Sequence, residues 1–381
     1  MRTLIIKLTV LTIALTLSAC SGGGGGSSLS GGNSSVPIPA APGVNGSNGG
    51  SNPGTQSLAA LLLREYATPF STFSVGATPD GRVWLDNSQQ LALLNPSGGI
   101  PVYGALAPGE SSTNHVTAMA TGTDGSLWYA LPAASSCSGG NFGYVNNLPE
   151  AGGTPTMYTI SGPGCYSIRA LTVGPDGNVW ASASGASGTG AILKFAPGHT
   201  SGQVSTYTLS FNPGPITSGP DGALWFIGTS GSFGAGILAR IDTSGNVSTI
   251  ANQSGRISNL TSLASGGGYV WATDQSRNYI ARFTTSGSET DYAVPIPKAV
   301  NQLGQLAVTG GFVYFTQPYN GIGQSTTGKI GQLSITTGAI LEYDAAGCNN
   351  LNPQSIGIDP TGNVWVSDSF GIDVQEFAFQ Q

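Results

Sequence analysis

Four oxygen-bearing side chains share one position of a repeated unit, three residues after a recurring aromatic residue. They are Asn87, Asp274, Gln317 and Asp368, and the other three units carry Leu131, Ala183 and Gly228 there. Carboxylate and amide oxygens suit hard cations such as Ca²⁺ or Mg²⁺, and they also bind hydroxyl-rich ligands. We therefore expect Asp274 and Asp368 as metal ligands and Asn87 and Gln317 as neutral donors. The alternative is that all four are ordinary solvated strand ends.

The recurring aromatic residue ends a short phrase that occurs seven times. The anchors lie 44, 52, 45, 46, 43 and 51 residues apart, and they are Trp84, Trp128, Trp180, Trp225, Trp271, Tyr314 and Trp365. A period in the forties with strand-like pieces in each unit is typical of a β-propeller. The sequence thus predicts an all-β, seven-bladed propeller over residues 58–381, with the anchors packed between adjacent blades.

The unit around Trp180 predicts four strands, at 167–173, 178–182, 191–195 and 205–209, with an Asp-Gly hairpin turn after the first. The last unit contains only three strands. Residues 63–67 (Leu-Arg-Glu-Tyr-Ala) match the outer strand 340–344 of the preceding unit. We expect them to complete the last blade beside residues 374–377 and so close the ring without an open edge.

A second polar set lies nine residues before each turn, where the innermost strands begin. It comprises Ser71, His115, Ser167, Asn212, Ser258, Asn301 and Asn352. Polar residues are common where strands meet water, and that is one explanation. The other is a ligand-binding face, where His115 and Arg169 on inner strands would join Asn87 and Gln317.

Three cysteines fall within the predicted propeller. Cys137 and Cys165 lie in loops that emerge on the same face, so we expect them to form a disulfide, and Cys348 lies across the ring as a free thiol. The long loops near Cys137 and at 317–328 account for the two spacings above 50 residues. Such loops are where binding specificity is usually found.

The phrases at 174–180 (Gly-Pro-Asp-Gly-Asn-Val-Trp) and 219–225 resemble the repeat of the virginiamycin B lyase (streptogramin lyase) family, as do the Glu-Tyr pairs at 65–66 and 342–343. The resemblance covers about residues 60–381. It implies linearisation of a cyclic depsipeptide antibiotic by elimination, using Mg²⁺ with histidine and glutamate side chains. Family members often carry a glutamate three residues after the Trp. No unit has one here, and the chain holds only His115 and His199.

The first residues resemble the signal of a bacterial lipoprotein. Arg2 and Lys7 precede an apolar run, and the lipobox-like Leu-Ser-Ala-Cys at 17–20 implies cleavage and acylation of Cys20 by chains such as palmitate. Ser21 after the cysteine favours the outer over the inner membrane of the cell envelope. Residues 1–20 are thus read as the signal, and the Gly/Ser-rich residues 21–57 as a flexible tether reaching about 30–36 Å.

Composition limits the partners. The formal net charge is −6 with 12 Lys and Arg, so no basic surface for nucleic acid is expected. We expect a monomeric, membrane-anchored propeller whose partners are the lipid bilayer and a small-molecule or protein ligand on its top face. The alternative is a Mg²⁺-dependent lyase or lactonase-like enzyme with an altered site, and a purely structural envelope protein also stays open.

Overall fold

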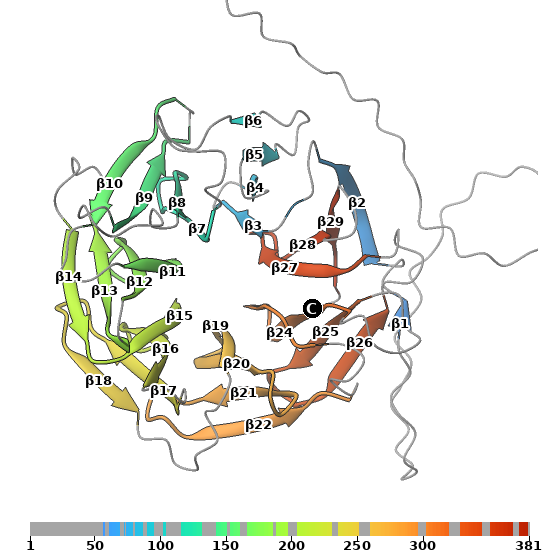
Figure 1. Cartoon of the computed structure of the whole chain (residues 1–381). Coiled ribbons are helices and arrows are strands. Elements are labelled where there is room, and N and C mark those ends of the chain that lie inside the picture. Colours follow the sequence, from blue (N-terminus) through green and yellow to red (C-terminus); the bar gives the residue numbers. More distant parts are fainter. Residues whose placement is uncertain are drawn as a thin grey trace, which may run out of the picture.

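The computed structural model describes residues 56–57, 61–68, 72, 74–78, 81–86, 90–94, 102–103, 116–131, 142–150, 153–160, 166–185, 188–196, 204–230, 235–250, 260–295, 302–319, 328–344, 351–368 and 373–379. Their strands form seven sheets arranged as blades around a central axis (Figure 1). The predicted all-β, seven-bladed propeller is therefore confirmed. These residues include no helix long and apolar enough to cross a membrane.

The first two strands of each blade lie nearest the axis. The innermost strands of blades 1 to 7 are β3 (Ser74–Ala77), β7 (Ala118–Thr121), β11 (Ser167–Val173), β15 (Asn212–Ser218), β19 (Leu260–Gly266), β23 (Leu306–Thr309) and β27 (Pro353–Ile358). The second strands are β4 (Val83–Asp86), β8 (Leu127–Leu131), β12 (Val179–Ser184), β16 (Leu224–Ser230), β20 (Tyr269–Asp274), β24 (Phe312–Gln317) and β28 (Val364–Asp368).

The remaining strands lead outward to the rim. The third strands are β5 (Leu91–Leu94), β9 (Phe142–Leu148), β13 (Gly190–Phe195), β17 (Ala235–Ile241), β21 (Tyr279–Phe283), β25 (Lys329–Ser334) and β29 (Asp373–Phe377). The outer strands of blades 1 to 6 are β6 (Val102–Tyr103), β10 (Thr156–Ile160), β14 (Val204–Leu209), β18 (Val247–Ile250), β22 (Glu289–Ala293) and β26 (Ile340–Asp344). We call the face where the innermost strands begin the top face.

The Asp-Gly turns on the opposite face need the conformational freedom of glycine. Gly177 has φ 75° and Gly222 has φ 74°, in the left-handed region that glycine adopts without steric cost. The aspartates before them are not in that region, since Asn278 is the one non-glycine residue with positive φ in the described part of the chain. The dipeptide therefore sets the turn through its second residue.

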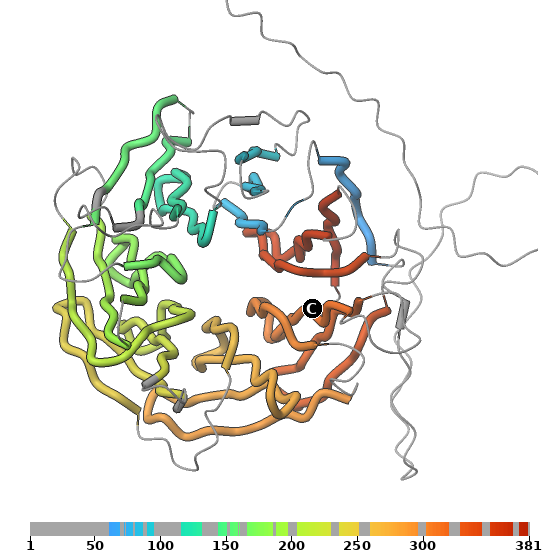
Figure 2. Tube along the Cα trace, in the orientation of Figure 1, coloured from blue at the N-terminus to red at the C-terminus, as the bar shows by residue number. Residues whose placement is uncertain are grey.

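The N-terminal strand β2 (Leu62–Ala67) supplies the outer strand of blade 7. It pairs antiparallel with β29, with Glu65 opposite Gln375 and Tyr66 opposite Val374. In Figure 2 the blue N-terminal strand lies beside the red C-terminal segment, and both belong to one blade. The predicted closure between residues 63–67 and 374–377 is confirmed, and it gives the third strand of blade 7 a hydrogen-bonding partner on each side.

One pairing was not predicted from the sequence. The two-residue strand β1 (Gln56–Ser57) runs parallel to β26 and makes blade 6 five-stranded. These two residues are the last of the segment read as a tether. The chain therefore touches the outer edge of blade 6 before it enters blade 7.

The anchor tryptophans fill the spaces between blades, as the sequence predicted. Trp84 of blade 1 packs with Tyr129 of blade 2, and Trp225 of blade 4 packs with Leu263 of blade 5. All six tryptophans are at most 2% exposed. Truncating such a side chain to alanine typically costs about 3–5 kcal/mol. Each anchor therefore joins its blade to the next.

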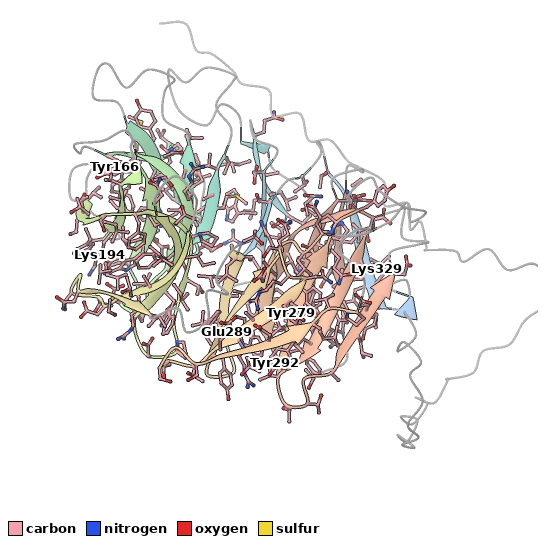
Figure 3. All side chains as sticks on the ribbon, turned by 60° about the horizontal axis from the view of Figure 1, so that its bottom comes forward. Tyr166, Lys194, Tyr279, Glu289, Tyr292 and Lys329 are labelled. Carbon is pink, nitrogen blue, oxygen red and sulfur yellow. The ribbon has the colours of Figure 1, made fainter. Side chains whose placement is uncertain are left out.

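A carboxylate of the turn orients the buried indole in three blades. The Trp180 Nε1–H donates to Asp176 Oδ1 at 3.0 Å, and Trp225 Nε1–H donates to Asp221 Oδ1 at 2.9 Å. Lys194, which is labelled in Figure 3, then binds Asp176 at 2.8 Å from the third strand of the same blade. The indole N–H is thus satisfied where burial would otherwise make it costly.

Blade 7 reaches the same geometry with its residues exchanged. Its turn has Thr361 where the other two blades have aspartate, and Asp359 where they have glycine. Trp365 Nε1–H donates to Asp359 Oδ2 at 3.0 Å. In blade 3 a Cβ on the corresponding Gly174 would lie 2.5 Å from the Trp180 Nε1. The carboxylate therefore comes from either of two positions, but not from both.

Deletion of residues 58–69 is expected to open the ring. Loss of β2 leaves an unpaired edge on β29, and exposed edges promote aggregation. Size-exclusion chromatography and thermal melting of the mature chain should show loss of the monomer and of the cooperative transition. Deleting 12 tether residues, 21–32, is the matched control. A deletion of 58–69 that melted like this control would contradict the closure.

Asp359→Asn tests the hydrogen bond from the Trp365 indole to the Asp359 carboxylate. Burial alone would raise the pKa of Asp359, but hydrogen bonds from Thr361, Trp365 and Asn363 outweigh it and hold the pKa below its usual 3.8. A carboxyl group whose pKa is lower in the folded state stabilises the fold at pH values above its unfolded-state pKa. This stabilisation is lost as the pH falls through the folded-state pKa. The variant should lose about 1.5–3 kcal/mol of unfolding free energy at pH 7.

Urea unfolding at pH 7 and at successively lower pH measures this difference. It should shrink as wild-type Asp359 becomes protonated. Asp242→Asn is the control, because Asp242 caps a similar turn through Ser244 and Asn246 without a tryptophan and should have a smaller effect. If the difference in unfolding free energy stayed constant over the whole acid range, the charge of Asp359 would not be what stabilises this turn.

Candidate functional site

The innermost strands are irregular near the top face. Their pairing with the second strands shifts register in blades 3, 4, 5 and 7, at 168–170, 213–216, 260–262 and 353–356. Such bulges redirect side chains and are frequent beside binding sites. In blade 3 the unpaired residue of the bulge is Arg169, one of the predicted ligand-binding residues.

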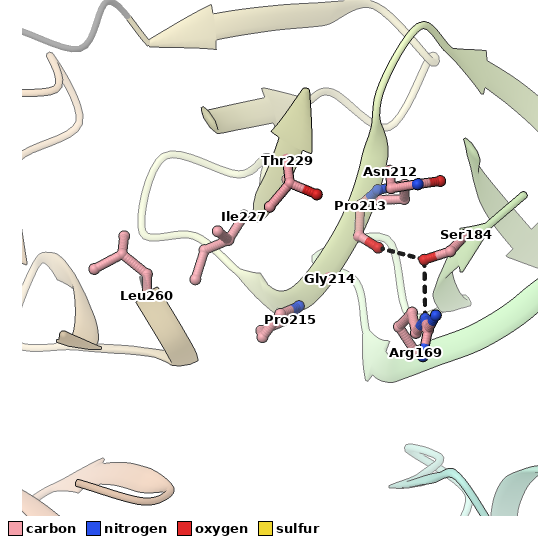
Figure 4. A pocket seen from close by; sticks show the side chains of 10 residues that line it. Arg169, Ser184, Asn212, Pro213, Gly214, Pro215, Ile227, Thr229 and Leu260 are labelled. Carbon is pink, nitrogen blue, oxygen red and sulfur yellow. Dashed lines mark hydrogen bonds between the residues drawn. The ribbon is translucent and has the colours of Figure 1, made fainter. Parts of the chain in front are cut away.

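A pocket of about 280 Å³ opens at this level across three neighbouring blades. Its residues come from the top ends of β11, β12, β15, β16 and β19, and Figure 4 shows them at close range. They are Arg169, Ser184, Asn212, Pro213, Gly214, Pro215, Ile227, Gly228, Thr229 and Leu260. The volume lies near the lower end of the range for small-ligand sites.

The pocket has a polar side and an apolar side (Figure 4). On the polar side Arg169 Nε–H donates to Ser184 Oγ at 2.9 Å, and Ser184 Oγ–H donates to the Pro213 carbonyl at 3.2 Å. Ile227 and Leu260 lie on the other side, and both are buried. None of the lining residues is acidic, so the guanidinium is the only formal charge among them.

The polar residues at the starts of innermost strands connect neighbouring blades. Asn212 Oδ1 accepts a hydrogen bond from Gly185 N at 3.2 Å, which reaches back to blade 3. Asn352 Oδ1 accepts one from Tyr319 N at 2.6 Å and reaches from blade 7 to blade 6. These two members of the predicted set thus have a structural role. His115 lies outside the described residues.

Asp274 lies in an ion-pair cluster within blade 5. It is fully buried, and its Oδ2 accepts from Arg277 Nε at 2.7 Å while its Oδ1 accepts from Ser276 Oγ at 2.7 Å. Arg277 also binds Asp291 and Glu289 on the outer strand. Burial, together with neighbouring Asp291, raises the pKa of Glu289. Arg277 therefore binds the carboxylate of Asp274, which the sequence predicts to be a metal ligand.

Gln317 and Asp368, which share the repeat position of Asp274, also make contacts within their own blades. Gln317 Nε2–H donates to buried Glu342 at 2.9 Å, and Asp368 Oδ1 accepts from Asn352 N at 2.8 Å. Asn87 lies outside the described residues. Within the described ranges no three His, Cys, Asp or Glu side chains form a group that could hold a metal. Asp274, Gln317 and Asp368 thus make contacts within their own blades, and the metal site at Asp274 and Asp368 remains a prediction.

The sequence singled out Arg169 but missed most of its surroundings. Ser184, Thr229 and Leu260 carry no motif, and only spacing relative to each anchor could have identified them. Arg169, Gly214 and Leu260 all lie seven residues before the first residue of their turns.

The cysteine predictions cannot be compared with the structure, because Cys20, Cys137, Cys165 and Cys348 lie outside the described residues.

Comparisons with solved structures place the fold among known propellers. A streptogramin B lyase structure aligns with a TM-score of 0.65 at 21% identity, covering 83% of this chain and 97% of that chain. Virginiamycin B lyase from Staphylococcus aureus aligns with a TM-score of 0.63 at 20% identity, covering 83% and 99%. YCF48 bound to D1 peptide aligns with a TM-score of 0.63 at 10% identity, covering 86% and 98%. No curated protein sequence matches the chain.

The sequence comparison with protein families is more specific than these structural similarities. A sequence model of the virginiamycin B lyase family matches residues 113–376, which span blades 2 to 7 and so include the whole pocket. The resemblance based on the repeated Gly-Pro-Asp-Gly phrases is thereby confirmed. This chain belongs to the virginiamycin B lyase family.

Proposed function

We propose that this protein is a lipid-anchored propeller of the bacterial cell envelope that binds a ligand on its top face. The observation that carries the proposal is the pocket at the start of the innermost strands of blades 3 to 5. It combines one arginine, neutral polar groups and an apolar wall, which is the usual composition of a small-ligand site.

The ends of the second strands support binding over elimination chemistry. No unit has glutamate at the position three residues after the anchor. Asp274 and Gln317, which stand there in blades 5 and 6, are engaged by Arg277 and Glu342 of their own blades. A propeller of the same fold, YCF48, binds a peptide, so the scaffold is compatible with a purely binding role.

The end of the proposed tether and the pocket lie in different parts of the propeller. Acylated Cys20 would insert into the outer membrane, with residues 21–57 as the tether. The last two residues of that segment pair with β26 at the outer edge of blade 6. The pocket lies along the innermost strands of blades 3 to 5. Gln56 and Ser57 therefore contact the propeller at its rim and not at the pocket.

A second function is a metal-dependent lyase or lactonase-like enzyme with an altered site. Membership of the virginiamycin B lyase family favours it. It would require catalytic groups other than the family histidine and glutamate set, because only His115 and His199 are present in the sequence. The two functions differ in whether substrate is consumed.

Cys20→Ser should release the protein from the membrane. Several acyl chains at about 0.8 kcal/mol per buried CH₂ hold a lipoprotein firmly, and serine cannot be acylated in the same way. Fractionation followed by immunoblotting should show loss of the variant from the outer-membrane fraction. Ser28→Ala in the tether is the control and should stay in the outer-membrane fraction. A Cys20→Ser chain that remained in the outer-membrane fraction would contradict the anchor.

Quinupristin is bound to a catalytically inactive virginiamycin B lyase in a solved structure, and its turnover separates the binding function from the enzyme. With Mg²⁺ present, mass spectrometry should show no linearised product above the buffer control. Linear product that disappears with a chelator would instead establish the enzyme.

Calorimetry of the wild type and of the Asp274→Ala, Asp368→Ala double variant tests the predicted metal site. If Asp274 and Asp368 are metal ligands, the variant should lose the binding of Ca²⁺ or Mg²⁺ that the wild type shows. Equal binding by both proteins would mean that the two carboxylates stay engaged within their blades.

A further inference from the structure

Arg169 differs from every other cation in the described part of the chain. That part contains eight Lys and Arg residues, and five of them pair with carboxylates at up to 3.1 Å. Arg282 lies over three aromatic rings, and Arg64 interacts with Tyr66 and Glu376. Within the same residues, Arg169 has neither an acidic nor an aromatic partner. In a chain of net charge −6, the positive charge of Arg169 thus has no counter-charge among the described residues.

The geometry of the guanidinium leaves its binding edge available. Ser184 takes the Nε–H at 2.9 Å, and no described residue accepts from the two terminal nitrogens. Ser184 in turn donates to the Pro213 carbonyl, so the Nε side of the guanidinium is fixed. The two terminal nitrogens of arginine match the two oxygens of a carboxylate and bind them through parallel hydrogen bonds.

The surroundings suit an anion that carries an apolar group. Asn212 also lines the pocket, and its side chain accepts from Gly185 through Oδ1, while no described residue accepts from its amide N–H groups. Leu260 is 8% exposed, and together with Ile227 it forms an apolar wall on the other side. About 280 Å³ accommodates a group of roughly the size of one amino acid residue with its end group.

Gly214 keeps the space between these two sides open. It is the residue of blade 4 that corresponds to Arg169 and Leu260, and a side chain there would lie between them. A Cβ on Gly214 would meet only the Ile227 carbonyl oxygen, at 3.6 Å, so the backbone does not require glycine for steric reasons. Its φ is not in the left-handed region. A larger side chain at this position can therefore block the pocket without straining the strand.

We propose that this pocket binds a carboxylate next to a short aliphatic side chain, with Arg169 as the carboxylate receptor and Leu260 and Ile227 as the aliphatic contact. The proposal rests on the binding function proposed above and specifies its ligand. This chemistry occurs in free N-acyl amino acids and at the C-terminus of a peptide. Both sources present the same carboxylate and side chain to the pocket.

The test uses the unlipidated Cys20→Ser chain and two pairs of probes. One pair is N-acetyl-leucine and its amide, and the other is the peptide Gly-Gly-Ala-Leu as free acid and as C-terminal amide. Binding is measured by calorimetry or ligand-observed NMR. We expect the acids to bind with a Kd of about 1 mM or tighter, and the amides at least about tenfold more weakly. Tighter binding of the peptide acid than of N-acetyl-leucine would identify a peptide C-terminus as the source.

Variants assign the effect to the pocket. Arg169→Gln should weaken acid binding at least about tenfold and leave amide binding unchanged, and Gly214→Leu should abolish both. Arg64→Gln, which removes an exposed arginine on blade 7, is the matched control and should bind like the parent. All variants are first compared by thermal melting.

Two results would overturn the carboxylate proposal. One is equal binding of acids and amides with no effect of Arg169→Gln, and the other is no binding of either acid up to about 10 mM. A neutral ligand that bound the parent but not Gly214→Leu would preserve the binding function while rejecting its carboxylate specificity. Failure of the proposed function itself would appear instead as turnover of quinupristin.

Discussion

Packing between adjacent blades is the interaction on which the rest of this structure depends. Each blade buries an aromatic anchor against the next blade, and Trp365 of blade 7 packs with Val75 and Leu85 of blade 1. A blade without a neighbour would expose that surface, so the ring must close on itself. Strand β2 completes the last blade with antiparallel hydrogen bonds. Strand β2 is therefore needed to close the ring although it lies at the outer rim.

The two faces of the ring have different physical tasks. On the turn face, carboxylates of Asp176, Asp221 and Asp359 hold buried indoles, and cations from the third strands neutralise the first two. On the top face, bulges interrupt the regular pairing and leave side chains outside the ladder. Stability is thus concentrated where the sequence repeats most faithfully.

The top face also shows how a family scaffold can keep its fold while the residues at its strand ends change. Asp274 of blade 5 and Gln317 of blade 6 occupy the position where family members often carry glutamate. Here their polar atoms bind Arg277 and Glu342 within the same blade. Because these contacts satisfy buried groups locally, the strands can end in polar residues without any ligand to hold them. Family membership therefore describes the scaffold more directly than the reaction.

Sequence patterns alone predict the blade count, the order of strands and the closure of the ring. These features follow from short-range patterns, namely the spacing of the anchors, the Asp-Gly turns and the match of residues 63–67 to an outer strand. The sequence did not reveal that Asp359 replaces the missing turn aspartate of blade 7, nor that Arg277 engages Asp274. Both depend on which side chains share a space after folding.

The candidate site was decided almost entirely by the tertiary structure. Arg169 was named from the sequence, but its isolation from acidic partners depends on residues of two further blades. Asn212 and Leu260 are 43 and 91 residues away along the chain, and only the ring brings them beside it. A repeat pattern fixes which residues are equivalent. Whether equivalent residues in neighbouring blades form a pocket depends on the bulge and on the side-chain volume at each of them.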